Sequence, residues 1–420
     1  MRLEGCCRVL LRWPTSVNQI SGIASTVAIS PQTTSVAPEW NLLLAAASSE
    51  ATEPDLARLR VSLEKAILNR AFEWESLLRL SEDHGTSSLL YQNLSLLGDL
   101  VPPSALAALR QRYEINVHKS LFLARELIRV LDCFDALGIE ALSYKGVVLS
   151  ELYYGDLALR QPGDIDLFVR RNEVARIKHA VRELGYTQHV AIPEDAERDY
   201  IASGYECSFD SLAGRGLLEV QWALQPRFYA VDFDMDRLFN RAVMVSVAGR
   251  NVKTPSAEDL LLVLAIHAAK HEWGRLLWLC DIAQILKRAA LDWTRVRERA
   301  QAIGVERILH TTLLLANQLL ATPIPSKIQA AIHADPSARA LADEIAQSLA
   351  AGVSHDVEQI SYFRLMMRLR ERTVDRLRFL ARLTFTPGPG EWEAVRLPRV
   401  LSPLYRVVRL ARLASRLVRR

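Results

Sequence analysis

Residues 160–169 read RQPGDIDLFV, and this stretch decides the fold. A Pro-Gly-Asp turn leads into an alternating run in which one isoleucine separates Asp164 from Asp166. Side chains alternate between the faces of a strand, so the two aspartates share one face and the intervening apolar residues point into a core. Two carboxylates about 4 Å apart repel each other by roughly 4 kcal/mol at an effective dielectric of about 20. The stretch is therefore either a turn before a strand that happens to begin with acids or a site for a divalent metal ion.

The segment around this strand predicts a small α/β core over residues 138–254. Changes in apolar spacing predict its elements: strands over 139–146, 164–169, 205–212 and 216–224, and an amphipathic helix over 170–186. In the last strand Leu218, Val220 and Trp222 share one face, which places Glu219 on the other. Glu219 is therefore a candidate third carboxylate, and Asp210, close to an expected turn, is a weaker one.

Helical spacing flanks this core on both sides. Residues 39–137 form an expected N-terminal helical region, with a long helix over 104–137 that ends at Gly138. Residues 255–384 form an expected C-terminal helical domain, which begins where Ser256 precedes two acidic residues. The fold class is α+β: a small mixed β-sheet core flanked by N-terminal helices and a C-terminal helical domain. Residues 1–38 are expected to be a disordered leader, and residues 385–420 a basic C-terminal segment.

Charge is distributed unevenly along the 420 residues. Residues 361–420 hold 15 arginines against four acidic residues, whereas the first 360 residues carry 37 Lys+Arg against 44 Asp+Glu. In the final helix, Val407 and Leu410 lie on an apolar face, with arginines elsewhere. Such a helix can contact an anionic surface such as a membrane or RNA, but we favour docking of its apolar face on the helical domain.

Cysteine usage and hydropathy exclude several classes of protein. Five cysteines without a CxxC pair argue against a disulfide framework and favour reduced thiols in a cytoplasmic protein. Arg8 and Arg12 interrupt the apolar run near the N-terminus, which makes it a poor signal peptide. The longest uncharged stretch, from Ile308, contains His, Thr, Asn, Gln and two prolines, so no transmembrane segment is expected.

Several residues outside the strand pair are candidates for the same site. Lys145 and Gly146 close the upstream strand, and a glycine lets the backbone approach a phosphate closely. Arg160 precedes Asp164 by four residues and can line the same opening. Mg²⁺ prefers carboxylate and phosphate oxygens, so this combination favours a nucleotide or another phosphorylated substrate.

A downstream helix carries further candidates. His267 and His271 are four residues apart, but the glutamate of an HExxH zinc motif is missing between them. Lys270, His271 and Arg275 are instead expected to face the core and touch nucleotide phosphates, unless this side of the helix is simply solvated. Asp281 is either a buried hydrogen-bond acceptor or a site residue, and the sequence does not decide between them.

The stretch SYKGVVLSELYYGDLALRQPGDIDLFVRRNEVARIKHAVRELGY, residues 143–186, resembles the polymerase-β-type nucleotidyltransferase superfamily. More narrowly, it is similar to bacterial nucleotidyltransferase-family proteins with a KG…LY…R…DIDLLV…L…GY core and a following DLHW-like strand. The weaker likeness extends over roughly residues 40–415. The resemblance implies a nucleotidyltransferase core at 138–254, with Asp164 and Asp166 as a metal-binding pair, Glu219 as the third acid, and Lys145 and Gly146 as the phosphate loop.

The activity that the resemblance implies is transfer of a nucleoside monophosphate from an NTP to an acceptor hydroxyl, with release of pyrophosphate. Mg²⁺ or Mn²⁺ would be the cofactor, and the acceptor is open: a protein or peptide, a sugar or lipid intermediate, or a nucleic acid. Two departures matter, because Lys-Gly-Val-Val replaces the usual Gly-Ser or Gly-Gly, and EVQW replaces DLHW. The alternatives are a toxin-type nucleotidyltransferase of a defence system, and a catalytically degenerate protein that binds a nucleotide or a partner.

Overall fold

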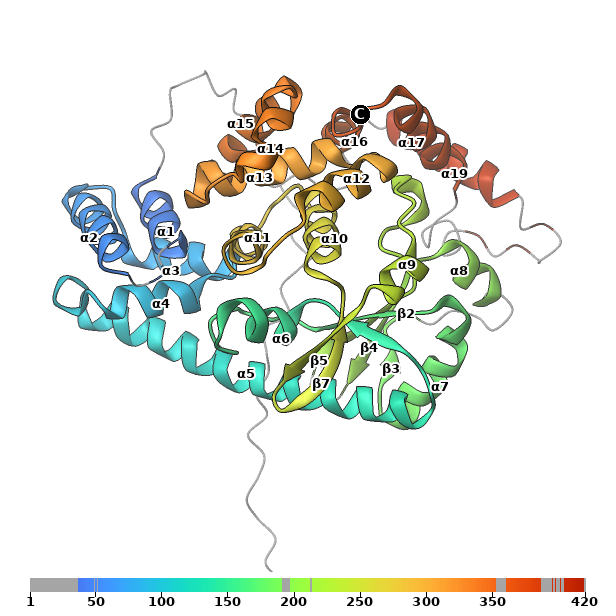
Figure 1. Cartoon of the computed structure of the whole chain (residues 1–420), viewed down its shortest axis with the longest axis horizontal. Coiled ribbons are helices and arrows are strands. Elements are labelled where there is room, and N and C mark those ends of the chain that lie inside the picture. The colour runs from blue at the N-terminus through green and yellow to red at the C-terminus, as the bar shows by residue number, and fades with distance from the viewer. Residues whose placement is uncertain are drawn as a thin grey trace, which may run out of the picture. The chain divides into compact units, whose positions relative to one another are not determined.

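The computed structural model contains a five-stranded mixed sheet with helices on both sides of it (Figure 1). Its strand order is β1-β2-β5-β4-β3, and the bounds are β1 Ala141–Ser143, β2 Ile165–Val169, β3 Thr187–Gln188, β4 Glu206–Ser211 and β5 Gly214–Gln221. β2 runs parallel to β5 and antiparallel to β1, whereas β4 is antiparallel to both β5 and β3. The expected strand at 164–169 is confirmed as β2, while the one at 139–146 shortens to β1.

The structure describes residues 37–48, 50, 52–190, 197–211, 214–352, 360–386, 395, 397, 401 and 404–418. All the helices and strands of the described ranges belong to one compact unit, Val36–Arg420. Residues 1–36 of the expected disordered leader, with Cys6 and Cys7, lie outside the described residues, as do parts of the basic C-terminal segment. Pro38, the last residue of the expected leader, is instead the first residue of helix α1 (Pro38–Ser48).

β2 is buried on both faces, as expected for an interior strand. Ile165, Leu167 and Val169 pack into an apolar cluster with residues of α5 (Pro103–Ala136) and α7 (Val174–Glu183). On the other face the Phe168 ring stacks on Tyr144 with centroids 3.9 Å apart. The alternation read from the sequence is thus confirmed, and α5 is the long helix expected over 104–137.

Helices precede and follow this sheet along the chain, as the predicted fold class requires. The N-terminal set is α1 Pro38–Ser48, α2 Glu53–Leu68, α3 Trp74–Asp83 and α4 Ser87–Ser95, followed by the 3₁₀ turn η1 Gly98–Leu100. The C-terminal set is α10 Ala257–Lys270, α11 Leu276–Arg288, α12 Trp293–Ile303, α13 Glu306–Leu320, α14 Ser326–His333, α15 Pro336–Ala350, α16 Ile360–Arg368, α17 Thr373–Phe385 and α19 Tyr405–Val418. The two sets share one apolar core, because buried residues of α1, α10 and α13 belong to the same cluster.

α10 begins where the sequence predicts a helix. The Ser256 side chain accepts a hydrogen bond from the Asp259 backbone N–H at 3.4 Å and so caps the helix. Almost all of α10 is buried, from Leu260 to Ala269, whereas Lys270 and His271 are half-buried and Arg275 is exposed. The helix ends at Lys270, next to the sheet.

A second, two-stranded sheet was not foreseen. β6 (Val243–Val247) and β7 (Arg250–Thr254) pair antiparallel through a turn in which Ala248 and Gly249 both have positive φ, 47° and 81°. Such a turn usually carries Asn-Gly or Asp-Gly, so Ala-Gly gives a weak sequence signal. The remaining short elements are α6 Gly146–Leu149, η2 Ser150–Tyr154, η3 Arg171–Glu173, α8 Glu197–Ser203, η4 Arg227–Tyr229 and α9 Met235–Asn240.

The C-terminal helix α19 does not dock as expected. It packs beside α17, but Val407 and Leu410 are 58% and 40% exposed. Tyr405 is the buried residue of its first turn. Docking through the apolar face is therefore wrong for the residues whose side chains are described, and a face that includes Arg409 is turned inward instead.

Among the described residues, no helix is both long enough and apolar enough to cross a membrane.

Candidate nucleotide and metal site

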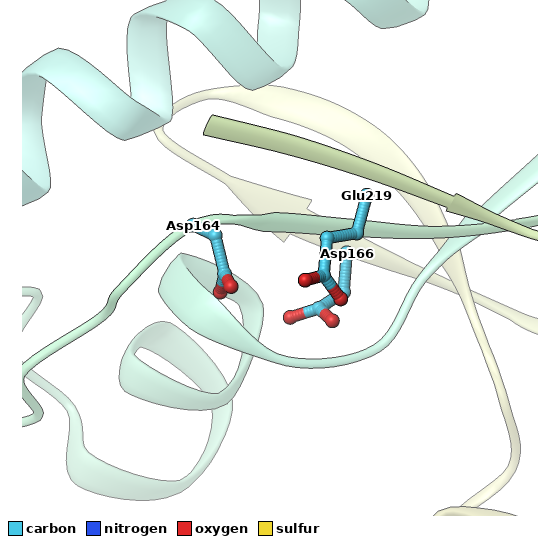
Figure 2. Close-up of side chains that lie close together, drawn as sticks. All are labelled: Asp164, Asp166 and Glu219. Atoms are coloured by element: carbon cyan, nitrogen blue, oxygen red, sulfur yellow. The ribbon is translucent and has the colours of Figure 1, made fainter. Parts of the chain in front are cut away.

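Three carboxylates meet at one end of the two central parallel strands (Figure 2). Asp166 of β2 is directly opposite Glu219 of β5 in the strand register, and Asp164 immediately precedes β2. Their ligand oxygens all lie within 4.8 Å of one another. Within the part of the chain that the structure describes, this is the one cluster of three or more His, Cys, Asp or Glu side chains arranged to hold a metal ion.

Asp166 is the most deeply buried of the three acids, at 2% exposure. Its Oδ1 accepts a hydrogen bond from Lys145 Nζ at 2.9 Å, whereas its Oδ2 is buried without a hydrogen-bond partner among the described residues. A buried carboxylate oxygen without a partner is costly. A cation held by Asp166 and its two acidic neighbours would remove that cost, so these residues fit a divalent metal ion.

Burial raises the pKa of two of the acids. Loss of water, together with the nearby Asp166 carboxylate, raises the pKa of Asp164 to about 7 and that of Glu219 to about 8. Burial alone would lower the pKa of Lys145, but Asp166 and Asp164 outweigh it and raise that pKa. The cluster therefore concentrates more negative charge than its surroundings neutralise, which favours binding of a cation.

Position 146 requires a glycine because its backbone lies close to that of Asp164, the residue before β2. Gly146 has φ +56°, and a Cβ at this position would lie 2.9 Å from the Asp164 carbonyl oxygen. Any side chain here would push against the backbone that carries the first carboxylate. The structure thus explains the Lys-Gly pair by a close approach to Asp164.

Arg160 lies at the site, but its guanidinium group is paired with the carboxylate of Asp281. Its Nε and Nη2 donate to the two Asp281 oxygens at 2.8 and 2.9 Å, and both side chains are almost fully buried. Tyr154 donates to the same carboxylate at 2.8 Å. Asp281 is therefore a buried hydrogen-bond acceptor, which answers the question that the sequence left open.

A hydrogen-bonded network supports the third acid. Gln221 Nε2 donates to Glu219 Oε2 at 3.2 Å and to Glu206 Oε2 at 3.3 Å. Tyr144 in turn donates to Gln221 Oε1 at 2.7 Å. Gln221, the Gln of EVQW, thus orients Glu219. Tyr144, the residue after β1, in turn holds Gln221 in place.

The end of α10 forms the opposite wall. Lys270 Nζ donates to Tyr205 Oη at 3.1 Å, and burial lowers the pKa of Lys270. Burial also lowers the pKa of His267 strongly and that of His271 to about 3, so both imidazoles are neutral. They pack on each other and on Trp278, and neither belongs to the acidic metal cluster.

A single cavity of about 680 Å³ joins these groups, which is within the size range of small-molecule sites. Its lining includes nine candidate residues predicted from the sequence: Lys145, Gly146, Arg160, Asp164, Asp166, Glu219, Lys270, His271 and Arg275. Asp210 is not among the lining residues and instead contacts His189 Nδ1 at 3.0 Å. Glu219, rather than Asp210, is thus the acid that the structure brings to the pair.

Sequence reasoning missed other residues of this cavity. Glu206 reaches it because β4 pairs with β5 in a register that sets Glu206 opposite Gln221. Lys119 of α5 does not line the cavity, but it is near enough to Asp164 for each to shift the pKa of the other. Arg409 and Arg412 of α19 also line the cavity. These placements depend on tertiary contacts over long sequence separations.

Comparison with known proteins identifies the family to which the chain belongs. A crystal structure of an antigenic nucleotidyltransferase-like protein from Paracoccidioides brasiliensis is similar over 50% of this chain and 92% of that chain, with 15% sequence identity and a TM-score of 0.33. The comparison with curated proteins finds no match. A family model described as "Uncharacterised nucleotidyltransferase" matches residues 70–321, which include the whole sheet and α10 to α13. The chain belongs to this nucleotidyltransferase family.

Proposed function

We propose that this protein transfers a nucleoside monophosphate from an NTP to an acceptor hydroxyl and releases pyrophosphate, with Mg²⁺ as the cofactor and Mn²⁺ as a substitute. In this reaction the acceptor oxygen forms a bond to the α-phosphorus, and the bond from that phosphorus to the pyrophosphate oxygen breaks. The observation that carries the proposal is the convergence of Asp164, Asp166 and Glu219 in the cavity of a nucleotidyltransferase-family chain.

The three carboxylates would hold the metal ions. Bound divalent cations would supply charge neutralisation for the triphosphate and the leaving pyrophosphate. Asp166, fixed by Lys145 and opposite Glu219, would be the central ligand. Glu219 would be the third ligand and the group that accepts the proton of the acceptor hydroxyl.

The other cavity residues would position the nucleotide. Lys145 and Lys270 would neutralise phosphate charge, and Gly146 would keep the loop close to Asp164. His271, being neutral, would offer a hydrogen bond rather than a charge. Arg160, bound to Asp281, would act mainly by holding the loop before β2 in place.

Pyrophosphate release tests this proposal. The full-length protein is incubated with each NTP, Mg²⁺ and a cell extract as the source of acceptor. We expect release with the parent protein and at least a roughly 100-fold loss with Asp164→Asn or Asp166→Asn, because each removes a metal ligand's charge.

The matched control is Asp210→Asn, which changes an acid of the same sheet outside the cavity. It should release pyrophosphate like the parent. Equal rates for the parent and both aspartate variants would leave a binding protein without catalysis, and the proposal would then be wrong.

A further inference from the structure

The C-terminal helices beyond the family match contribute part of the cavity wall. The family model ends at residue 321, yet five later residues line the cavity together with the acids: Tyr362, Phe363, Leu383, Arg409 and Arg412. The cavity of the nucleotidyltransferase core is therefore completed by a segment that the family description does not cover.

Specific contacts fix the C-terminal helices against the core. Tyr362 of α16 donates to the Lys270 carbonyl oxygen at 3.0 Å, and Arg382 of α17 pairs with Asp232 at 2.6 and 2.8 Å. These two anchors hold α16 and α17 next to the end of α10 and the η4 turn. The wall is thus built from paired residues of both segments.

α19 is held on this wall through one of its arginines. Arg409 Nε donates to the Leu383 carbonyl oxygen at 2.7 Å, and its guanidinium lies 5.9 Å from the centre of the Phe228 ring. Arg412 follows three residues later, so both side chains lie on one side of the helix and line the same cavity. By contrast Arg406, one turn earlier, is exposed and lies outside the lining.

The charges in the cavity indicate that these arginines bind phosphate. Lys145 pairs with Asp166 and Arg160 with Asp281, so each of these two cations shares its charge with a carboxylate. A triphosphate brings further negative charge into a cavity that also contains Glu206. Guanidinium groups bind phosphate through paired hydrogen bonds, and they stay charged even when partly buried.

We propose that Arg409 and Arg412 bind the terminal phosphates of the NTP, so that the C-terminal helix α19 forms part of the nucleotide site. This inference rests on the proposed function. It also gives the arginine-rich C-terminal segment an anionic partner inside the cavity: the substrate.

Equilibrium binding of nucleotides to the full-length protein tests this inference. Each of the four Mg–NTPs is titrated, and the one that binds most tightly is compared with the NMP of the same base. Arg412→Ala is expected to weaken NTP binding roughly tenfold or more, the usual consequence of losing a charge-assisted hydrogen bond, while NMP binding stays the same. Arg409→Ala should do likewise, and its thermal unfolding is measured because Arg409 also supports Leu383.

Arg406→Ala is the matched control, since it removes the same charge from the same helix on an exposed side. It should bind the NTP like the parent. NTP binding by Arg412→Ala equal to that of the parent overturns the inference, and so does an equal loss for NTP and NMP. Unchanged NTP binding with slower transfer to an acceptor would assign the arginines to the acceptor instead. If the parent protein binds no NTP, the proposed function itself fails and this inference with it.

Discussion

Asp166 and Glu219 show how a single register of two strands creates a site. Because β2 and β5 are parallel and Asp166 is opposite Glu219, their side chains project from the same face. Asp164 joins them from the residue before the strand. The glutamate at the third position reaches one methylene farther than an aspartate would, and Gln221 holds its carboxylate at 3.2 Å.

The length of this third side chain should matter for the rate. Glu219→Asp withdraws the carboxylate by about one carbon–carbon bond, and a misplacement of about 1 Å costs on the order of 100-fold in rate. Glu219→Gln keeps the length but loses the charge, and we expect an equal or larger loss. Pyrophosphate release under saturating NTP measures both variants, and full activity of Glu219→Gln would exclude Glu219 as a ligand or base.

At the scale of elements, Gly146 lets α6 begin close to the residue that precedes β2. Gly146→Ala should strain the left-handed backbone by about 1–2 kcal/mol and also push a Cβ against the Asp164 carbonyl, 2.9 Å away. We expect lower stability in urea unfolding and a large loss of activity. Gly138→Ala is the control, because Gly138 also has a positive φ, +67°, but has no atom within 4 Å of its added Cβ. It should show the loss of stability alone, and an equal loss of activity in both variants would contradict this account.

The ion pair between Arg160 and Asp281 joins the loop before β2 to α11. Asp281→Asn leaves a buried guanidinium without its counter-charge, which should lower the free energy of unfolding by about 3–5 kcal/mol. Replacing both residues, with Arg160→Met and Asp281→Leu, should cost less than the single change because no buried charge remains. Urea unfolding measures each variant, and a single variant as stable as the parent would show that the pair is not a structural link.

At the scale of the whole molecule, the sequence predicted local features well and long-range placements poorly. The period-two pattern identified β2 and the face of Glu219, and Ser256 identified the start of α10, because these depend on neighbouring residues. The partner of Arg160, the arrival of Glu206 through the β4 register, and the inward side of α19 all depend on contacts between distant segments. The β6–β7 hairpin was missed because its Ala-Gly turn resembles no common hairpin signal.

The stability of the metal-free molecule should depend on pH through the acidic cluster. The pKa values of Asp164 and Glu219 are raised in the folded state to about 7 and about 8, so the folded protein keeps protons that the unfolded chain loses near pH 4. Their contribution is complete below the unfolded pKa and is lost as the pH rises through the folded values. We therefore expect the thermal midpoint to fall as the pH rises from about 4 to about 8, and Mg²⁺ to restore part of it at the high end.

The double variant Asp164→Asn with Glu219→Gln should show a flatter pH dependence and no response to Mg²⁺. A parent protein whose midpoint is constant over this pH range and insensitive to Mg²⁺ would contradict the proposed charge state of the cluster.

The central claim, that the three carboxylates direct transfer of a nucleoside monophosphate, is tested most directly by the fate of the label. The full-length protein is incubated with Mg²⁺, an acceptor-containing cell extract and an NTP labelled either at the α- or at the γ-phosphate. We predict that the α-label becomes attached to an acceptor, that the γ-label is released in pyrophosphate, and that Asp166→Asn abolishes both. Attachment of the γ-label, or α-labelling that persists in Asp166→Asn, would contradict the claim.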